Sequence, residues 1–126
     1  MNLTDMAQYI GQKGFGVPGR NLFAYAMPES TSTGLLVTSQ VPINRNMYVP
    51  ELRQGEFQVI ARGSKHEDLI TQLSSVSNAL RLQGVTIGQM YFRYITPMND
   101  PLVFPRAESR LLEASVNFKF AFTQSV

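Results

Sequence analysis

The chain has 126 residues, a formal net charge of +2 and no cysteine. Its length suits a single domain, residues 1–126, that buries a hydrophobic core without disulfides or metals. The absence of cysteine excludes disulfides, thiolate metal sites and cysteine nucleophiles, and the basic residues form no run typical of nucleic-acid-binding tails.

The first elements expected along the chain are a helix and a β-hairpin. A helix is predicted over residues 3–12, because the apolar side chains there recur at helical spacing. Residues 21–27 are apolar and aromatic, as in a strand, and a proline follows them. Apolar residues resume at Leu35 after a polar turn, so residues 21–38 are predicted to form a hairpin.

The middle of the chain combines a long loop, a strand and the clearest helix. Residues 41–55 have no hydrophobic period and are expected to form a loop of a length that is often functional. Residues 56–62 alternate as a strand does. A helix is predicted over residues 65–82 from its apolar spacing, with a capping box formed by Ser64 and Glu67.

Two strands are predicted to finish the chain. Gly84 is placed to end the preceding helix, and alternating residues predict strands over 85–96 and 110–123. The proline-rich segment 97–109 between them is expected to be a projecting loop. Strands that segregate from helices indicate the α+β class, with one antiparallel-rich sheet of about five strands packed by an N-terminal and a central amphipathic helix.

The sequence contains fragments of metal-binding and cofactor-binding motifs, but the surrounding residues do not complete them. The only histidine, His66, has no second histidine four residues later, as a zinc-binding helix requires. Gly14, Gly16 and Gly19 have the spacing of a dinucleotide-binding fingerprint, but no strand precedes them and no helix follows. We therefore expect no catalytic residue, no metal and no cofactor, and nothing in the sequence favours an enzyme.

Aromatic residues leave one alternative among binding functions. Residues 91–94 interleave three aromatic side chains with Arg93, as in a sheet that stacks on RNA bases. Alternation puts Phe92 and Tyr94 on one face and Tyr91 with Arg93 on the other, for which core packing is the simpler explanation. A small RNA-binding domain stays as an alternative.

A family resemblance rests on the order of elements and a few residues. The segment from Pro50 to Leu80 contains a strand that ends in Arg62-Gly63 and leads into an amphipathic helix. A long strand, a proline-rich loop and a closing aromatic strand with Asn117-Phe118-Lys119-Phe120 follow. In this pattern the chain resembles the bacteriophage minor capsid or tail terminator family.

The resemblance implies a structural protein of the virion tail and neck, with no catalytic residues. Proteins of this kind form a homohexameric ring that caps the tail tube and joins it to the head–neck connector protein. The implied partners are further copies of the chain, the tail tube protein and the connector, while genomic DNA passes through the lumen without specific binding. Another neck protein, such as a head-completion or connector adaptor, is the nearest alternative.

The expected location follows from the same resemblance and from hydropathy. Polar residues interrupt the first thirty positions, and no segment reaches the roughly 18 apolar residues of a membrane-spanning helix. We therefore expect neither a signal peptide nor a membrane span, and assembly in the host cytoplasm.

Candidate contact residues lie in and beside the two long loops. Five apolar loop residues lack an obvious core partner, and we predict that they anchor a subunit interface, with packing over their own sheet as the alternative. These residues are Met47, Tyr48, Leu102, Val103 and Phe104. Four arginines that flank the loops are predicted to line a lumen or to pair with acidic groups of a neighbouring subunit, with ordinary solvated charge as the alternative. They are Arg45, Arg53, Arg106 and Arg110.

Overall fold

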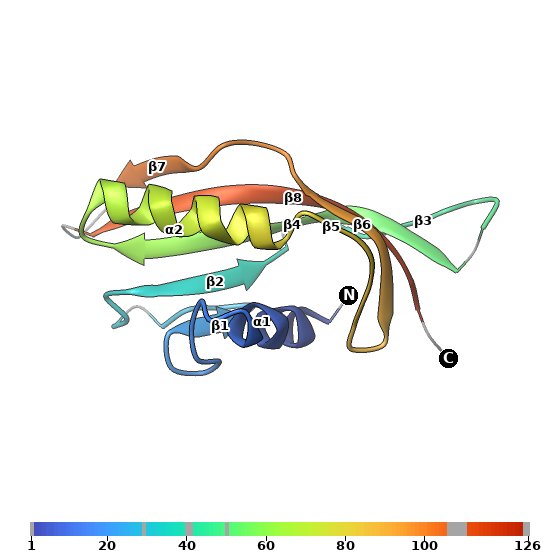
Figure 1. The fold of residues 1–126 in the computed structure, drawn as a ribbon, viewed down its shortest axis with the longest axis horizontal. Helices are drawn as coiled ribbons and strands as arrows, with labels where there is room; N and C mark the ends of the chain where they lie inside the picture. The colour runs from blue at the N-terminus through green and yellow to red at the C-terminus, as the bar shows by residue number, and fades with distance from the viewer. Residues whose placement is uncertain (1, 29, 40–41, 50, 106–110, 125–126) are drawn as a thin grey trace.

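The computed structural model describes residues 2–28, 30–39, 42–49, 51–105 and 111–124. Within these residues the chain forms helices and a curled sheet (Figure 1). The helices are α1 (Leu3–Gln12) and α2 (His66–Ala79). The strands are β1 (Leu22–Ala24), β2 (Gly34–Thr38), β3 (Asn44–Arg45), β4 (Leu52–Gly63), β5 (Leu82–Ile87), β6 (Met90–Pro97), β7 (Leu102–Pro105) and β8 (Leu112–Gln124). The α+β class is confirmed, with an 8-stranded sheet in place of the expected five strands.

The sheet is built on the long antiparallel pair of β4 and β8. These strands align from Leu52 opposite Thr123 to Gly63 opposite Leu112. The strand order is β1-β2-β4-β8-β6-β5, while β3 pairs with the start of β4 and β7 with the start of β8. β1 is parallel to β2 and the other described pairs are antiparallel, so the sheet is mixed.

Helix α1 forms where its apolar spacing predicts. The Asn2 side chain caps its start, because Oδ1 accepts hydrogen bonds from the backbone N–H groups of Thr4 at 3.0 Å and Asp5 at 3.2 Å. Its buried stripe packs against β1 and β2. The stripe consists of Leu3, Met6, Ala7 and Ile10.

Helix α2 is confirmed, but its predicted cap and stop are wrong. Lys65 is the N-cap residue and makes no side-chain capping hydrogen bond, because the helix begins one residue too late for Ser64 to pair with Glu67. The helix ends at Ala79, and Gly84 lies inside β5 with a φ of +64°. The buried face that packs on β4 and β8 is the predicted one, formed by Leu69, Leu73 and Val76.

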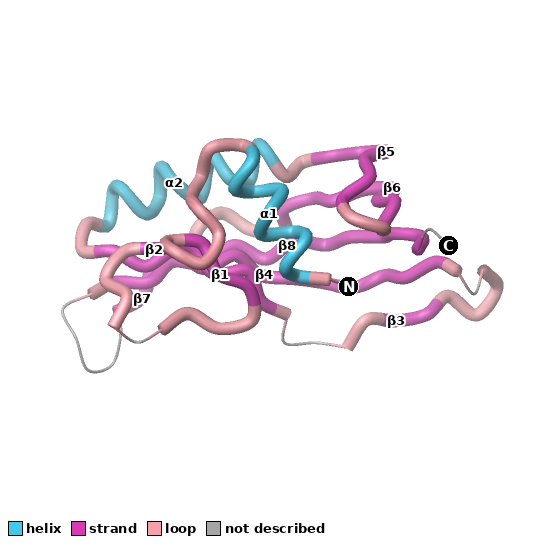
Figure 2. The backbone as a smooth tube through the Cα atoms, turned by 90° about the horizontal axis from the view of Figure 1, so that it is seen from below, coloured by secondary structure: helices cyan, strands magenta, loops and turns pink. Residues whose placement is uncertain are grey.

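The hydrophobic core lies between the two helices and one face of the sheet. Phe57 on β4 is opposite Phe118 on β8, and their rings stack with centroids 5.0 Å apart. Phe92, Phe120 and Phe122 continue this aromatic cluster, which confirms the alternation predicted for the last strand. Both helices lie on this side of the sheet (Figure 2), so the opposite face, here called the open face, carries no helix among the described residues.

The hairpin predicted over residues 21–38 is wrong, because β1 and β2 run parallel. Tyr25 has a φ of +72°, in the left-handed region, and redirects the chain directly after β1. β1 has only 3 residues, so the return to the start of β2 at Gly34 is short and needs no crossover helix.

The strand predicted over 85–96 is also wrong, because the chain forms two strands there. β5 and β6 are joined by a turn at Gly88, which has a φ of +61°. The register shifts between Phe92 and Tyr94, so Ile95 joins Phe92 in the core in place of Tyr94.

Both segments expected to be loops contain strands. The segment 97–109 includes β7, and the segment 41–55 includes β3 and the first residues of β4. Each adds a short strand at one end of the long central pair.

Candidate functional site

The described residues hold no cluster of side chains suited to bind a metal ion. No group of three or more His, Asp or Glu side chains among them lies close enough together to hold a metal ion. The predicted surface position of His66 is observed, as it is exposed at the first turn of α2. None of the helices in this part of the chain is both long and apolar enough to cross a membrane.

One hollow of about 890 Å³ lies between the start of α1 and the β5–β6 turn. It is lined by Asn2, Thr4, Asp5, Tyr25, Gly88, Gln89 and Met90. This lining supplies one carboxylate and no histidine, whereas acid–base catalysis needs groups that converge on a reacting bond. Two surfaces carry the predicted contact residues.

The first surface is an arm that projects from one end of the molecule (Figure 1). We define the arm as β3, the start of β4 up to Gln54, and the turn between them. Asn44 lies opposite Gln54 and Arg45 opposite Arg53, so β3 forms a short ribbon with the start of β4, which also pairs with β8 on its other side. The sequence missed this ribbon because β3 has only 2 residues and the turn shows no alternating pattern.

The tip of the arm exposes apolar side chains, and hydrogen bonds join residues 46–49. The Asn46 Oδ1 atom accepts hydrogen bonds from the backbone N–H groups of Tyr48 at 2.8 Å and Val49 at 2.9 Å. The backbone N–H of Leu52 donates to the Val49 carbonyl at 2.9 Å and closes the turn. Met47 is 85% exposed and Tyr48 is 88% exposed, so both predicted contact residues point away from their own chain.

The arm also carries two of the four predicted arginines. Arg45 is exposed, and its side chain makes no ion pair with another described residue. It lies directly opposite Arg53, and like charges in this arrangement repel. Arg53 has interactions inside the chain. Arg106 and Arg110 lie outside the described residues.

The second surface is β7, where the other predicted contact residues separate by face. Val103 lies opposite Ala114 and packs against the core. Leu102, opposite Ser115, is 64% exposed on the open face. Phe104 lies on the same face and is also exposed. The structure therefore brings Leu102 and Phe104 together and turns Val103 inward.

Across the open face runs a line of side chains that the sequence analysis did not find. Phe23 lies opposite Leu36, Leu36 opposite Ile60, Ile60 opposite Ser115, and Ser115 opposite Leu102. We call these five residues the apolar row, and Ser115 is its only polar member. The row depends on the register of five strands, so no local pattern in the sequence could reveal it.

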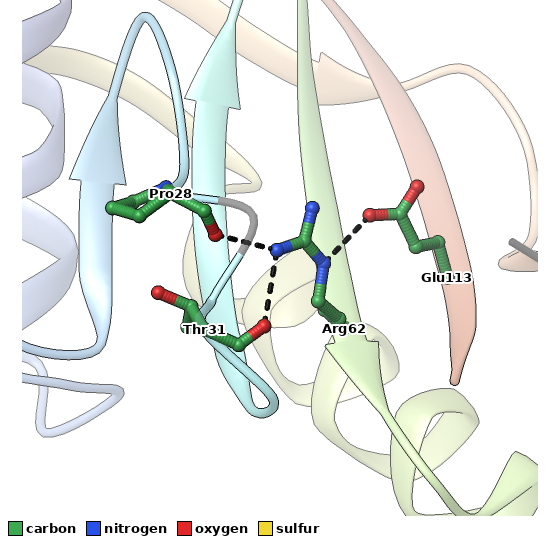
Figure 3. Close-up of polar contacts among 4 residues, drawn as sticks. All are labelled: Pro28, Thr31, Arg62 and Glu113. Atoms are coloured by element: carbon green, nitrogen blue, oxygen red, sulfur yellow. Dashed lines mark hydrogen bonds and ion pairs between the residues drawn. The ribbon is translucent and has the colours of Figure 1, made fainter. Parts of the chain in front are cut away.

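Beside the row, Arg62 forms a nearly buried polar cluster (Figure 3). Its Nε atom is 2.9 Å from Glu113 Oε2, and its Nη1 atom donates to the carbonyls of Pro28 at 2.8 Å and Thr31 at 3.0 Å. The guanidinium group thus holds the β1–β2 connection against the sheet. Arg62 is part of the Arg62-Gly63 step that carries the family resemblance, and its role is structural.

Gly63, the second residue of that step, lies in close contact with α2. A β-carbon at this position would lie 3.1 Å from Leu69 Cδ2, so glycine lets α2 approach the end of β4 closely. Both residues of the step serve the fold.

Comparison with known proteins supports a structural role. A protein-family model described as "Bacteriophage tail terminator protein" matches residues 9–124. This range includes α2, all the described strands and the last four residues of α1. No curated protein matches the chain.

Proposed function

Because this chain belongs to the bacteriophage tail terminator family, we propose that it forms a homohexameric ring that caps the tail tube. The family is one of structural proteins, and the chain is a structural component of the phage tail. In our proposal the ring, built from one domain per subunit, also meets the head–neck connector protein. Assembly takes place in the host cytoplasm, and the ring remains in the neck of the virion.

The placement of the exposed apolar residues carries this proposal. Met47 and Tyr48 extend from one end of the long β4–β8 pair, while Leu102 and Phe104 lie at its other end (Figure 1). Closed rings are made by heterologous contacts, in which two different surfaces of the same subunit meet. A chain with distinct apolar surfaces at opposite ends supplies both halves of such a contact.

A lumen for DNA is compatible with the charge of the chain. The net charge is +2, whereas tight DNA binding requires many basic groups that neutralise phosphates together. In our proposal DNA therefore passes through the ring without specific binding. The surfaces of the ring that face the tail tube protein and the connector complete its contacts.

Electron microscopy of particles from a phage in which this gene is disrupted tests the proposal. We expect overlong or irregular headless tails beside full heads, because tube growth has lost its stop, and complementation with the intact gene should restore normal length. Tails of normal length beside unjoined or leaking heads would instead assign the protein to the connector side of the neck. Intact infectious particles would contradict any role in the neck.

A further inference from the structure

The tip of the arm has the properties of a preformed binding element. The two hydrogen bonds to Asn46 Oδ1 fold residues 46–49 back on themselves, which reduces the conformational entropy that this stretch loses on binding. The shape presents Met47 and Tyr48, and these residue types are enriched in protein interfaces. Two large, exposed apolar side chains at a projecting turn are typical of a surface that contacts a partner.

The apolar row has the composition of a surface that receives such an element. Its members Phe23, Leu36 and Ile60 are half-buried on the open face, and Leu102 is largely exposed at one end. Polar residues flank the row on both sides, with Arg62 and Glu113 on one side and Thr38, Gln58 and Asn117 on the other. Phe104, opposite Glu113, extends the apolar surface on the first side. An apolar centre within a polar rim is the usual anatomy of a protein interface.

The arm of a subunit does not reach the row of the same subunit. Both are anchored on β4, the arm at Arg53 and the row at Ile60, which places them roughly 23 Å apart along the strand. The arm also extends away from the row (Figure 1). An arm tip that packs on the row therefore comes from a different molecule.

We propose that this molecule is a second copy of the chain, whose arm tip packs across the apolar row of its neighbour. The inference rests on the proposed ring, because each subunit then gives one arm and receives another until the ring closes. Contact between two identical patches would give a dimer and leave one of the two surfaces unused.

Cysteine cross-linking tests this contact directly, because the chain has no native cysteine. Tyr48→Cys supplies a thiol at the arm tip, and Leu102→Cys or Leu36→Cys supplies one in the row. Tyr48→Cys and Leu102→Cys change largely exposed side chains, so both proteins should fold. When a Tyr48→Cys protein is mixed with a row variant and oxidised, we expect disulfide-linked pairs, since a disulfide requires Cα atoms within about 7 Å.

The double variants Tyr48→Cys with Leu102→Cys and Tyr48→Cys with Leu36→Cys extend the test to the closed assembly. We expect at least one to give a ladder of covalent oligomers that ends at the subunit number of the ring, both in purified protein and in isolated tails. Val17→Cys is the matched control, because Val17 is 54% exposed but lies in the loop after α1, away from the open face. Mixed with Tyr48→Cys, it should give no linked pairs.

The other outcomes separate this inference from the proposed function. A ring seen by native mass spectrometry without any arm-to-row cross-link would overturn the contact and leave the ring in place. Tyr48→Cys linked to itself, or to the tail tube protein in isolated tails, would equally overturn it. Absence of a ring both in solution and on tails would remove the proposed function and this contact with it.

Discussion

Arg62 on β4 and Glu113 on β8 lie directly opposite each other, and an ion pair of 2.9 Å joins their side chains. The same guanidinium group binds two carbonyls of the β1–β2 connection, those of Pro28 and Thr31. One nearly buried residue therefore joins β8 and a surface connection to β4. This relationship explains why an arginine precedes Gly63 at the end of the strand.

Replacing Arg62 is expected to destabilise the fold. Arg62→Met removes the ion pair and leaves the Glu113 carboxylate and two carbonyls without this donor, which should lower the free energy of unfolding by about 2–4 kcal/mol. Urea denaturation followed by circular dichroism measures the change. Arg62→Lys should recover only part of the loss, since a single ammonium group does not reproduce the planar fork of donors. An unchanged midpoint for Arg62→Met would contradict the role of this cluster.

Gly88 provides a test of how α1 is held against the β5–β6 turn. It has a φ of +61°, and a β-carbon there would collide with the Asp5 carboxylate. Gly88→Ala should cost about 2–3 kcal/mol, compared with about 1 kcal/mol for Gly14→Ala, whose φ is also positive but whose β-carbon would meet open space.

A double-mutant cycle separates the two causes at Gly88. In an Asp5→Ala background the collision is gone, so the cost of Gly88→Ala should fall to that of Gly14→Ala. The free energy of unfolding in urea is the measurement. Equal costs of Gly88→Ala in both backgrounds would show that α1 does not press on the turn.

The N-terminus of α2 offers a stabilising substitution. Lys65 is the N-cap residue with extended backbone and no side-chain cap, and its positive charge opposes the helix dipole. Lys65→Ser should add a capping acceptor and raise the free energy of unfolding by about 0.5–1 kcal/mol. Lys65→Ala removes the charge without adding a cap. A higher melting temperature for Lys65→Ser than for Lys65→Ala would therefore measure the stabilisation that comes from the capping hydrogen bond. Equal melting temperatures would contradict it.

The elements that the sequence predicted well have strong local periods. Leu69, Leu73 and Val76 recur on one helical face, and the phenylalanines of β8 alternate without interruption. In both cases burial follows the period, because a single face of each element meets the core. Local pattern was therefore sufficient for these elements.

Other elements depend on contacts that are distant in sequence. A polar turn between two apolar strands reads as a hairpin, but pairing of β2 with β4 and the turn of the chain at Tyr25 make β1 and β2 parallel. The bulge between Phe92 and Tyr94 changes which side chains face the core. It leaves no trace in the alternating pattern of apolar and polar residues in the sequence. Such outcomes are decided by tertiary pairing, which a single sequence does not reveal.

The candidate surfaces also combine features that the sequence predicts with features that depend on tertiary pairing. Composition singled out Met47, Tyr48 and Leu102 because they sit in segments without a period, and all three are exposed. It also singled out Val103, which packs inward, since strand β7 was not recognised. Leu36 and Ile60 looked like ordinary strand residues, and only the register places them in one row.

We expect a substitution at Tyr48 to weaken assembly without affecting the stability of the fold. Because its side chain is 88% exposed, Tyr48→Ser should change the free energy of unfolding by less than about 0.5 kcal/mol. By contrast, Phe118→Ala in the core should cost about 3–5 kcal/mol. Size-exclusion chromatography with light scattering should nevertheless show a loss of oligomers for Tyr48→Ser. Unchanged oligomers would contradict a contact at the arm tip.

Arg45 distinguishes a subunit contact from a lumen position. Arg45 is exposed and lies opposite Arg53. Because Arg53 already interacts within its own chain, we choose Arg45 as the arginine of the arm for substitution. Arg45→Glu replaces a repulsive cross-strand pair by an attractive one and should raise the stability of the isolated subunit by roughly 0.2–1 kcal/mol. If Arg45 pairs with an acidic group on a neighbour, the same change should weaken the ring, with Arg45→Gln in between.

Salt supplies the second measurement for Arg45. An ion pair between exposed groups weakens as ionic strength rises, so rings of the native protein should dissociate more at 0.5 M than at 0.05 M salt. Arg45→Gln should show a smaller dependence, because the pair is already absent. Light scattering across a salt series gives both quantities. Rings of Arg45→Glu that persist at every salt concentration would place this side chain in the lumen or in solvent, because only a subunit contact makes ring stability depend on its charge.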